Sequence, residues 1–558
     1  MDEVFSSLGG SNKKQETEMH DNGQTVESGK KNTLGVSLEF VKTTLRTREA
    51  PTMREKVNAF NEERTLIEQG NPEAIREQHE KGRLTARERV IRLLDHDSFE
   101  ELDLWRRPYE TGYPGEGAGQ GDGLVTGYGS IDERPVTICA QDAAVMDGTV
   151  GTVHARKATM MMENALNART PMITVFDSAG LRALDAIQYP DFYSFSSMAY
   201  FQTLASGVVP KISLVMGECS GELAIVAGLG DFVFMVRNTS YAHLMPPPPG
   251  IESRNLGDPW DVHAKVGSCD VLAENEEDCL LKCRQLLSYL PLHNMESPPV
   301  VDMGDDPDRR EEELLELVPV NTSKVFNMHK LISLVVDKGE FFEIKNHFAR
   351  NLITAFARLD GHTIGLVASN PRFMGGCMTL DAADKMSRFV RFCDAFNIPL
   401  IWFADTPAFL PSIEEETRGL IRHGSRMIMA NSQATVPRIT LAVRKHFGGG
   451  RLAMPGPFLA CDLAIAWPTV QPGLMGAEGA VSIIYKKELR AIPDETLRRE
   501  QEKKRIEEMR WSLDMQVREG SEKIIDPRDT RPFLIKALKW LRNRKQDLPQ
   551  KKHDNIRM

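Results

Sequence analysis

An internal repeat constrains the fold of this 558-residue chain more than any other sequence feature. Three apolar segments recur in the same order, and the offset between paired positions is nearly constant: 228 residues (399 − 171) for the first two and 227 (437 − 210) for the third. The paired segments are 134–142 with 362–370, 170–177 with 398–405, and 209–214 with 436–441. Three matches in order favour a duplicated domain over chance similarity between strands.

The repeated segments also indicate the class of fold. From about residue 123, short apolar strands alternate with helical patterns, which is typical of an α/β layer architecture. We therefore predict two related α/β domains, 51–305 and 306–558, with the boundary in the acidic segment 302–316. Residues 1–50 are polar and poor in large apolar side chains, so we predict a disordered extension there.

Composition excludes several classes of partner. The net charge of −10 gives no electrostatic case for binding nucleic acid or an anionic membrane. No apolar run reaches the roughly 18 residues that span a bilayer, and Asp2 and Glu3 do not fit a secretory signal. The eight cysteines, mostly inside apolar runs, indicate reduced thiols and a cytoplasmic protein. Cys279 and Cys283 have no second ligand pair nearby, so we expect no metal site.

A glycine-rich turn, Gly448–Gly450, follows the apolar run 436–443, which is typical of a short buried strand. A strand that ends in glycines can present bare backbone N–H groups to a ligand, and two such groups can hold an oxyanion. A tight structural turn is the alternative for the glycines alone. No Lys-Ser or Lys-Thr follows them, so the turn is not a phosphate-binding loop.

The repeat pairs this turn with the first domain. Gly449 takes the place of Gly221-Glu222, and Pro407-Ala408 corresponds to Ala179-Gly180. Each domain therefore offers strand-end turns of small residues around one potential pocket. Two related oxyanion holes suit a reaction that forms two oxyanions, one on each of two substrates.

At this point the chain resembles a known family, the carboxyltransferase β-subunits of biotin-dependent acyl-CoA carboxylases, of the propionyl-CoA carboxylase type. The similarity runs from about Met53 to the C-terminus in long collinear segments. These are GRLTARERVIRLLD (82–95), GDGLVTGYG (121–129), LDGHTIGLVASNP (359–371), RFVRFCDAFNIPL (388–400), FLPSIEEETRGLIRHG (409–424), AWPTVQPGLMGAEGAVSIIY (466–485) and IIDPRDTR (524–531).

The resemblance implies two tandem domains of the crotonase-like (ClpP/crotonase) fold and a homo-hexamer or hetero-oligomer. It places acyl-CoA on the first domain of one subunit and carboxybiotin on the second domain of another. The sequence has no biotin-attachment motif and no ATP-binding biotin carboxylase region. A partner must therefore supply both the biotin carboxyl carrier and the biotin carboxylase. The implied function is to move a carboxyl group from carboxybiotin to the α-carbon of an acyl-CoA thioester.

The family's motifs carry over onto specific positions. The DSGGAR motif falls on 177–182 and makes Ala179 and Gly180 the donors to the thioester enolate. The GGA segment of RKAYGGAY makes Gly449 and Gly450 the donors to the biotin ureido oxygen. The substrate-binding positions are Ser178, Gly221, Glu222 and Leu452.

The implied chemistry needs no protein base. The ureido group left by loss of CO2 can remove the α-proton, and the enolate then attacks CO2. We therefore interpret His154, His423 and His446 as structural or rim residues.

The first domain departs from the family pattern. Ala179 replaces a glycine, so its Cβ intrudes and a positive φ becomes costly. Glu222 also replaces a glycine and would repel an enolate by ~1–4 kcal/mol, unless it turns away into an ion pair or the substrate has changed. A proline-rich loop, 244–250, replaces the family's segment near the CoA-side pocket.

Two alternatives to acyl-CoA carboxylation remain open. The same chemistry run backwards gives the carboxyltransferase subunit of a biotin-dependent decarboxylase of malonyl- or methylmalonyl-type thioesters. The departures at Ala179 and Glu222 and the proline-rich loop support the other, a catalytically weakened paralogue that acts as an assembly or regulatory subunit.

Overall fold

The computed structural model describes residues 51–109, 120–188, 195–456, 459, 461–520, 523–544, 546–553 and 555. The predicted disordered extension, 1–50, lies outside these ranges. The chain divides into two compact units, Met1–Leu66 and Ile67–Met558. Helix α2 (Met53–Gln69), which begins in the first unit, buries none of its side chains. Everything described below belongs to the second unit.

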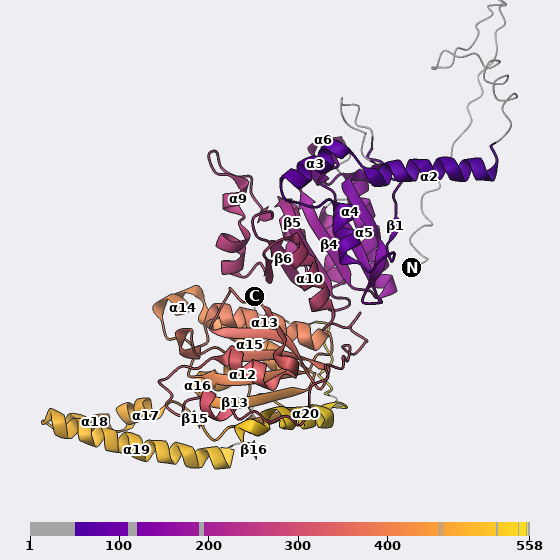
Figure 1. Ribbon diagram of the computed structural model, residues 1–558. Helices are drawn as coiled ribbons and strands as arrows, with labels where there is room; N and C mark the ends of the chain where they lie inside the picture. Colours follow the sequence, from indigo (N-terminus) through magenta and orange to yellow (C-terminus); the bar gives the residue numbers. More distant parts are fainter. Residues whose placement is uncertain are drawn as a thin grey trace, which may run out of the picture. The chain divides into compact units, whose positions relative to one another are not determined.

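The first half of the repeat builds an eight-stranded sheet with the order β1-β2-β3-β4-β5-β6-β8, and β7 pairs with β5 (Figure 1). Its strands are β1 (Glu100–Leu102), β2 (Leu124–Ile131), β3 (Arg134–Gln141), β4 (Met172–Ser178), β5 (Lys211–Ser220), β6 (Phe232–Val236), β7 (Tyr241–His243) and β8 (Val271–Ala273). β1, β2 and β3 are antiparallel, whereas every pairing from β3 to β8 is parallel.

Helices cover both faces of this sheet because its central strands are apolar on both sides. Residues Ile173 and Val175 of β4 join one core, and the alternate residues Met172 and Phe176 join another. The first core includes α4 (Ala86–Leu93) and α10 (Glu276–Leu287), and the second includes α5 (Thr152–Ala168), α7 (Phe195–Leu204) and α8 (Glu222–Gly228). Shorter helices in this half are α3 (Pro72–Glu80), α6 (Ala183–Gln188) and α9 (Ser253–Leu256).

The second half repeats the sheet with the order β16-β14-β13-β12-β11-β10-β9, and β15 pairs with β13. Its strands are β9 (Phe341–Ile344), β10 (Leu352–Leu359), β11 (His362–Ser369), β12 (Leu400–Thr406), β13 (Arg438–Phe447), β14 (Leu463–Ala466), β15 (Gln471–Gly473) and β16 (Lys523–Ile524). Its helices are α11 (Leu314–Leu317), α12 (Met328–Val335), α13 (Leu380–Ala395), α14 (Ile413–Arg418), α15 (Leu420–Gln433), α16 (Gly448–Ala453), α17 (Ala477–Ile484), α18 (Lys486–Arg490), α19 (Glu495–Gly520) and α20 (Thr530–Leu541).

The structure confirms the tandem repeat element by element. The hairpins β2–β3 and β10–β11, and the strands β4 and β12, match residue for residue at an offset of 228 (172 against 400). The strands β5 and β13 match at an offset of 227 (211 against 438). One residue is therefore missing from the second half between β12 and β13, as the sequence comparison predicts.

The two sheets share part of their core. Phe232 on β6 packs edge-on against Phe356 on β10 and Phe392 on α13, with ring centroids 5.9 and 4.6 Å apart. This common core accounts for the single compact unit from Ile67 to Met558. The domain boundary at residue 305 stays a prediction, and it falls in the segment that joins the two sheets.

Three further properties of the described residues concern membrane crossing, disulfide bonds and metal binding. Among the helices in the described ranges, none combines the length and the apolarity that crossing a membrane requires. All eight cysteines are free thiols, and six of them are buried. Within the same ranges, no group of three His, Cys, Asp or Glu side chains is placed to hold a metal ion.

Candidate active site

The turns that carry the predicted site residues lie at the carboxyl ends of the central strands in each half. At this edge the pairing of β4 with β5 shifts register between Phe176 and Ser178, and the pairing of β12 with β13 shifts in the same way. Gly148 and Gly376 pass over these strand ends with φ of 62° and 79°. A Cβ there would lie 2.3 and 2.6 Å from the carbonyl oxygens of Asp177 and Asp405. Glycine is therefore required at both positions.

In the second half, a buried ion pair fixes the strand end. Arg444 on β13 donates from Nη2 to Asp405 Oδ2 at 2.9 Å, and both side chains are fully buried. The backbone N–H of Lys445 donates to Asp405 Oδ1 at 2.8 Å. Asp405, near the end of β12, therefore fixes the last residues of β13, which lead directly into the glycines.

The first half holds its equivalent aspartate in another way. Arg83 donates to Asp177 Oδ1 at 3.0 Å, and Arg89 on α4 donates to Asp177 Oδ2 at 2.8 Å. Arg89 also pairs with buried Glu276, and these two carboxylates raise its pKa. Gly217 stands where the second half has Arg444, and a Cβ there would lie 1.9 Å from Asp177 Oδ1. The cation therefore comes from a helix instead of the neighbouring strand.

The three glycines that start α16 each have a steric reason to be glycine. Gly448 has φ of 41°, a conformation that favours glycine, and Gly221 before α8 has φ of 67°. A Cβ on Gly449 would lie 2.8 Å from the Phe409 ring, and one on Gly450 would lie 2.5 Å from the Thr406 carbonyl oxygen. These contacts account for the structural-turn interpretation without excluding a second role.

Gly449 and Gly450 also present backbone donors. As residues of the first turn of α16, they have no carbonyl four residues back to accept their N–H groups within the helix. Across the parts of the chain that the structure describes, no other acceptor contacts either N–H. The two donors predicted from the sequence are therefore adjacent and unbonded; Gly449 is half-buried and Gly450 buried, whereas Leu452 on the same helix is exposed.

The backbone N–H groups of Ala179 and Gly180 are the donors predicted in the first half. The structure has a positive φ at Gly180 (99°) and not at Ala179, so the cost expected for a positive φ at Ala179 does not arise. The Ala179 N–H donates to the Asp147 carbonyl at 3.1 Å. The Gly180 N–H donates to the hydroxyl of Ser178 at 3.1 Å. A change of the Ser178 χ1 rotamer would move this acceptor oxygen, so the N–H of Gly180 is the easier of the two to free for a ligand.

Glu222 occupies the first turn of α8, the position that Gly449 has in α16. Its side chain is exposed. Within the described ranges it forms no ion pair, so the ion pair suggested from the sequence is not present there. The carboxylate lies instead at a helix N-terminus, where a negative charge is favourable.

A pocket of about 470 Å³ lies beside Ala179 in the first half. Its lining is polar and mixes cations, carboxylates and neutral hydrogen-bonding groups. The lining residues are Gln78, Lys81, Arg83, Ala143, Asp147, Asp177, Ala179, Glu218, Asn238, Thr239, Tyr241 and Arg254. Of these, the sequence analysis singled out only Ala179 as a site residue.

Glu218 is the most informative residue that the sequence analysis missed. It accepts a hydrogen bond from the Tyr241 hydroxyl at 2.9 Å and another from the Ser220 hydroxyl. Burial and the nearby Glu218 carboxylate raise the pKa of Tyr241, which therefore stays a donor at neutral pH. A charged residue near the end of the otherwise apolar strand 211–220 was the signal that could have identified it.

The three histidines have structural partners. His154 is buried, donates from Nδ1 to the Asp122 carbonyl at 3.0 Å, and has its pKa lowered to about 3 by burial. His446 donates to the Met454 carbonyl at 3.0 Å, and burial lowers its pKa to about 4. His423 contacts Asp384 at 2.7 Å. Both buried rings are therefore neutral imidazoles near pH 7.

Comparison with known proteins identifies the family to which this chain belongs. Residues 77–556 match the model of the carboxyl transferase domain family. The methylmalonyl-CoA decarboxylase subunit alpha of Veillonella parvula is 39% identical over 90% of this chain and 99% of its own. The propionyl-CoA carboxylase carboxyltransferase subunit of Haloferax mediterranei is 38% identical over the same shares of the two chains.

A solved structure matches as well. The transcarboxylase 12S hexamer, solved with methylmalonyl-coenzyme A and methylmalonic acid bound, superposes with a TM-score of 0.86 at 35% identity. The match covers 92% of this chain and 99% of that one. The tandem sheets, the glycine turn after β13 and these matches agree, and the chain belongs to the carboxyl transferase domain family.

Proposed function

We propose that this carboxyltransferase moves a carboxyl group between biotin carried by a partner chain and the α-carbon of an acyl-CoA thioester. The observation that carries the proposal is the pair of open backbone N–H groups of Gly449 and Gly450. Relatives of both the carboxylase and the decarboxylase type support the reaction class, because the names of both include an acyl-CoA thioester.

The second half suits the ureido group of biotin. Two adjacent N–H donors can bind one ureido oxygen, and neither residue has a side chain of its own to obstruct a ligand because both are glycine. When bound, carboxybiotin supplies the carboxyl group, and the ureido oxygen gains negative charge as that group leaves. Gly449 and Gly450 would stabilise this charge, and losing one such donor typically costs ~3–4 kcal/mol of barrier.

The first half suits the acyl-CoA thioester. The Gly180 N–H would be released by a change of the Ser178 χ1 rotamer, and it could then donate to the thioester oxygen as the enolate forms. Lys81, Arg83 and Arg254 line the adjacent pocket and complement the phosphate groups of coenzyme A. Ala179 keeps its own N–H on Asp147, so it shapes the turn without donating to the substrate.

A specific observation favours a second candidate, an assembly or regulatory subunit of low activity. The Ala179 N–H is engaged, and the unpaired carboxylate of Glu222 occupies a position equivalent to Gly449. The direction of transfer is a further alternative. A biotin-dependent decarboxylase would use the same residues in reverse, and relatives of both types are similarly distant from this chain.

Transfer to free biotin tests the function directly. The full chain would be incubated with biotin and a panel of malonyl-, methylmalonyl- and longer carboxyacyl-CoA thioesters, and the decarboxylated thioester would be measured by mass spectrometry. We expect turnover of at least one thioester that depends on biotin. The double variant Ala179→Gly/Glu222→Gly runs in parallel. If only this variant is active, the low-activity subunit is correct, and if neither protein is active, the enzyme proposal fails.

The assembly and the partner of this chain are inferred from the same family. We infer a homo-hexamer or hetero-oligomer, as in the 12S transcarboxylase hexamer, together with a partner that carries biotin and a biotin carboxylase. A cytoplasmic location accords with eight free thiols. Light scattering after size-exclusion chromatography measures the assembly, and co-purification with a biotinylated chain tests the partner.

A further inference from the structure

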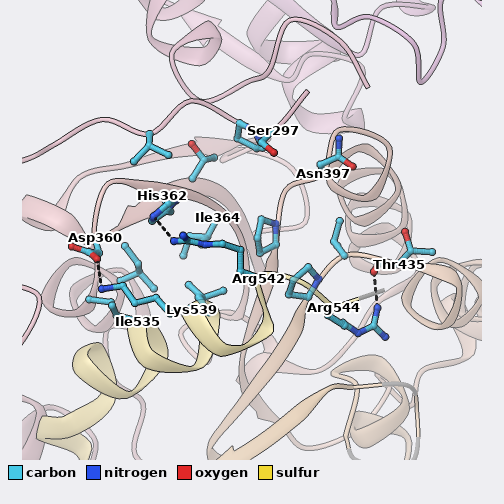
Figure 2. Close-up of a pocket in the computed structure, with 18 of the residues that line it drawn as sticks. Ser297, Asp360, His362, Ile364, Asn397, Thr435, Ile535, Lys539, Arg542 and Arg544 are labelled. Carbon is cyan, nitrogen blue, oxygen red and sulfur yellow. Dashed lines mark hydrogen bonds and ion pairs between the residues drawn. The ribbon is translucent and has the colours of Figure 1, made fainter. Parts of the chain in front are cut away.

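A second cavity lies at the opposite end of the second sheet from the glycine turn. It has a volume of about 660 Å³ and is lined by the residues that begin β11, β12 and β13 and by α20 (Figure 2). Pro437 precedes β13 and Gly448 follows it, so the ten residues of the strand, at roughly 3.3 Å each, separate them. The cavity is therefore independent of the candidate active site, roughly 30 Å away along the strand.

The wall of this cavity mixes apolar and polar side chains, and cations gather on one side. The apolar residues include Val300, Leu359, Ile364, Val436, Ile535 and Leu538. Lys539 Nζ pairs with Asp360 at 2.7 Å, and Arg544 pairs with Asp462. These two cations already have carboxylate partners.

Arg542 differs from its neighbours. Its Nη2 donates to Nε2 of His362 at 3.0 Å, which requires the imidazole to be neutral (Figure 2). Burial, Arg542 and Lys539 lower the pKa of His362, and Asp360 opposes this shift. No carboxylate in the described parts of the chain lies within ion-pair distance of Arg542. Arg542 is therefore the cation of this group that lacks a carboxylate partner within the described ranges, and its exposed side chain shares the cavity lining with Asp360 and Asp547.

A buried hydroxyl gives a second, independent observation. Thr363 on β11 is 2% exposed and lines the cavity. Its Oγ1 has no hydrogen-bond partner among the described residues. Buried hydroxyl groups are normally paired, so an orphan in a cavity wall indicates a polar group that the protein itself does not supply.

We propose that this cavity binds a small amphipathic carboxylate, whose head pairs with Arg542 and whose apolar chain fills the space between α20 and the sheet. An arginine matches a carboxylate through two parallel hydrogen bonds, and Thr363 adds a donor on the cavity wall. A volume of about 660 Å³ suits one small organic molecule. The site lies at the opposite end of the sheet from the glycine turn, so the ligand would act as an effector and not as a substrate.

Calorimetric titration of the full chain with octanoate tests the proposal. Octanol, which keeps the chain but lacks the charge, and inorganic phosphate, which keeps a charge but lacks the chain, serve as comparison ligands. We expect saturable binding of one octanoate per chain, and at least tenfold weaker binding of the other two ligands. Arg542→Glu should weaken octanoate binding at least tenfold, because it puts a carboxylate where the head group binds.

Lys536→Glu is the matched control. It makes the same charge reversal on α20, at an exposed residue outside the cavity wall, and should leave octanoate binding unchanged. Circular dichroism and thermal unfolding establish that both variants are folded. Three results would each overturn the proposal: no saturable binding of octanoate, equal binding of octanol, or equal weakening by Arg542→Glu and Lys536→Glu.

Discussion

The two halves of the repeat share a scaffold but differ in the charge that they place at the end of the central strand. In the first half, Glu218 lies near the end of β5 and Glu222 is the first residue of α8. At the equivalent positions the second half has Lys445 and Gly449. Because both halves keep the same strands and the same anchoring aspartates, these side chains diverged without changing the fold. The half with a lysine and glycines is the better host for a developing anion.

Buried lysines show how closely the scaffold is kept. Lys157 on α5 donates to the carbonyls of Gly121 and Leu124, and Lys385 on α13 donates to three carbonyls, including that of Leu352. In each half the lysine ties the first long helix to the segment that enters the hairpin. The repeat therefore preserves a buried lysine for architecture, while the turns carry the differences in function.

The largest expected effect concerns the anchoring of Asp405. Arg444→Met removes the only side chain that donates to this buried carboxylate in the described parts of the chain. Removing one partner of a buried ion pair typically costs ~3–5 kcal/mol, and Lys445 Nζ, 3.9 Å from Asp405 Oδ2, is too distant to replace the hydrogen bonds of Arg444. We expect the free energy of unfolding, measured by denaturant titration, to fall by that amount.

Arg83→Met is the matched change in the first half. Asp177 keeps its contact with Arg89, so the loss should be at most about 1–2 kcal/mol. Equal losses in the two variants would show that the two aspartates are held equivalently, against the difference described between the halves.

The second effect is on activity. Gly449→Pro deletes one proposed donor, and proline is tolerated in the first turn of a helix because its missing N–H is unpaired there anyway. We expect kcat for carboxyl transfer to fall about 10²–10³-fold. Gly449→Ala is the control for the steric change, since it adds the Cβ near Phe409 but keeps the N–H.

Ala179→Pro makes the corresponding change in the first half, where the repeat already places Pro407 at the equivalent position. The Ala179 N–H is engaged with Asp147, so we expect a loss of no more than about tenfold, the cost of one hydrogen bond. A loss as large as that of Gly449→Pro would identify Ala179 as a direct donor to the substrate.

The duplicated fold was predictable because apolar strands leave a regular pattern that survives divergence. The segments at offsets of 228 and 227 became paired strands, and Gly449 and Gly450 were found adjacent and open. It was harder to predict which backbone N–H groups are already hydrogen-bonded within the protein. The hydrogen bond of Ala179 to Asp147 depends on a loop more than thirty residues away, which no local pattern encodes. Glu218 and Tyr241 meet only because β5 and β7 pair.

The third effect is a pH dependence of stability. Burial lowers the pKa of Lys385 to about 7 and that of Lys157 to about 8 in the folded chain. An unfolded lysine titrates near 10.4, so between these pH values the unfolded state binds more protons and stability rises with pH. From pH 7 to 9 this contribution grows by about 2 kcal/mol for Lys385 and about 1 kcal/mol for Lys157.

Replacement by methionine isolates these contributions. The rise in stability between pH 7 and 9, measured by denaturant titration, should be smaller in Lys385→Met than in Lys157→Met, and largest in the unsubstituted chain. Other titrating groups cancel in this comparison because all three proteins share them. If both variants keep the full rise, the buried lysines retain their protons when folded, and the carbonyl contacts alone explain their burial.

The smallest expected effect concerns Glu222. Its carboxylate is exposed, so water screens most of its repulsion on an enolate, and ~1 kcal/mol at 4 Å is the limit in water. Glu222→Gln should therefore raise kcat/KM by no more than about fivefold. The same change removes a favourable charge from the start of α8 and should lower stability slightly. Glu163→Gln, at an exposed position on α5, controls for a general loss of negative charge. A rise well above tenfold in Glu222→Gln alone would mean that the carboxylate faces the substrate in a site shielded from water, and the first half would then be held in a repressed state by this one residue.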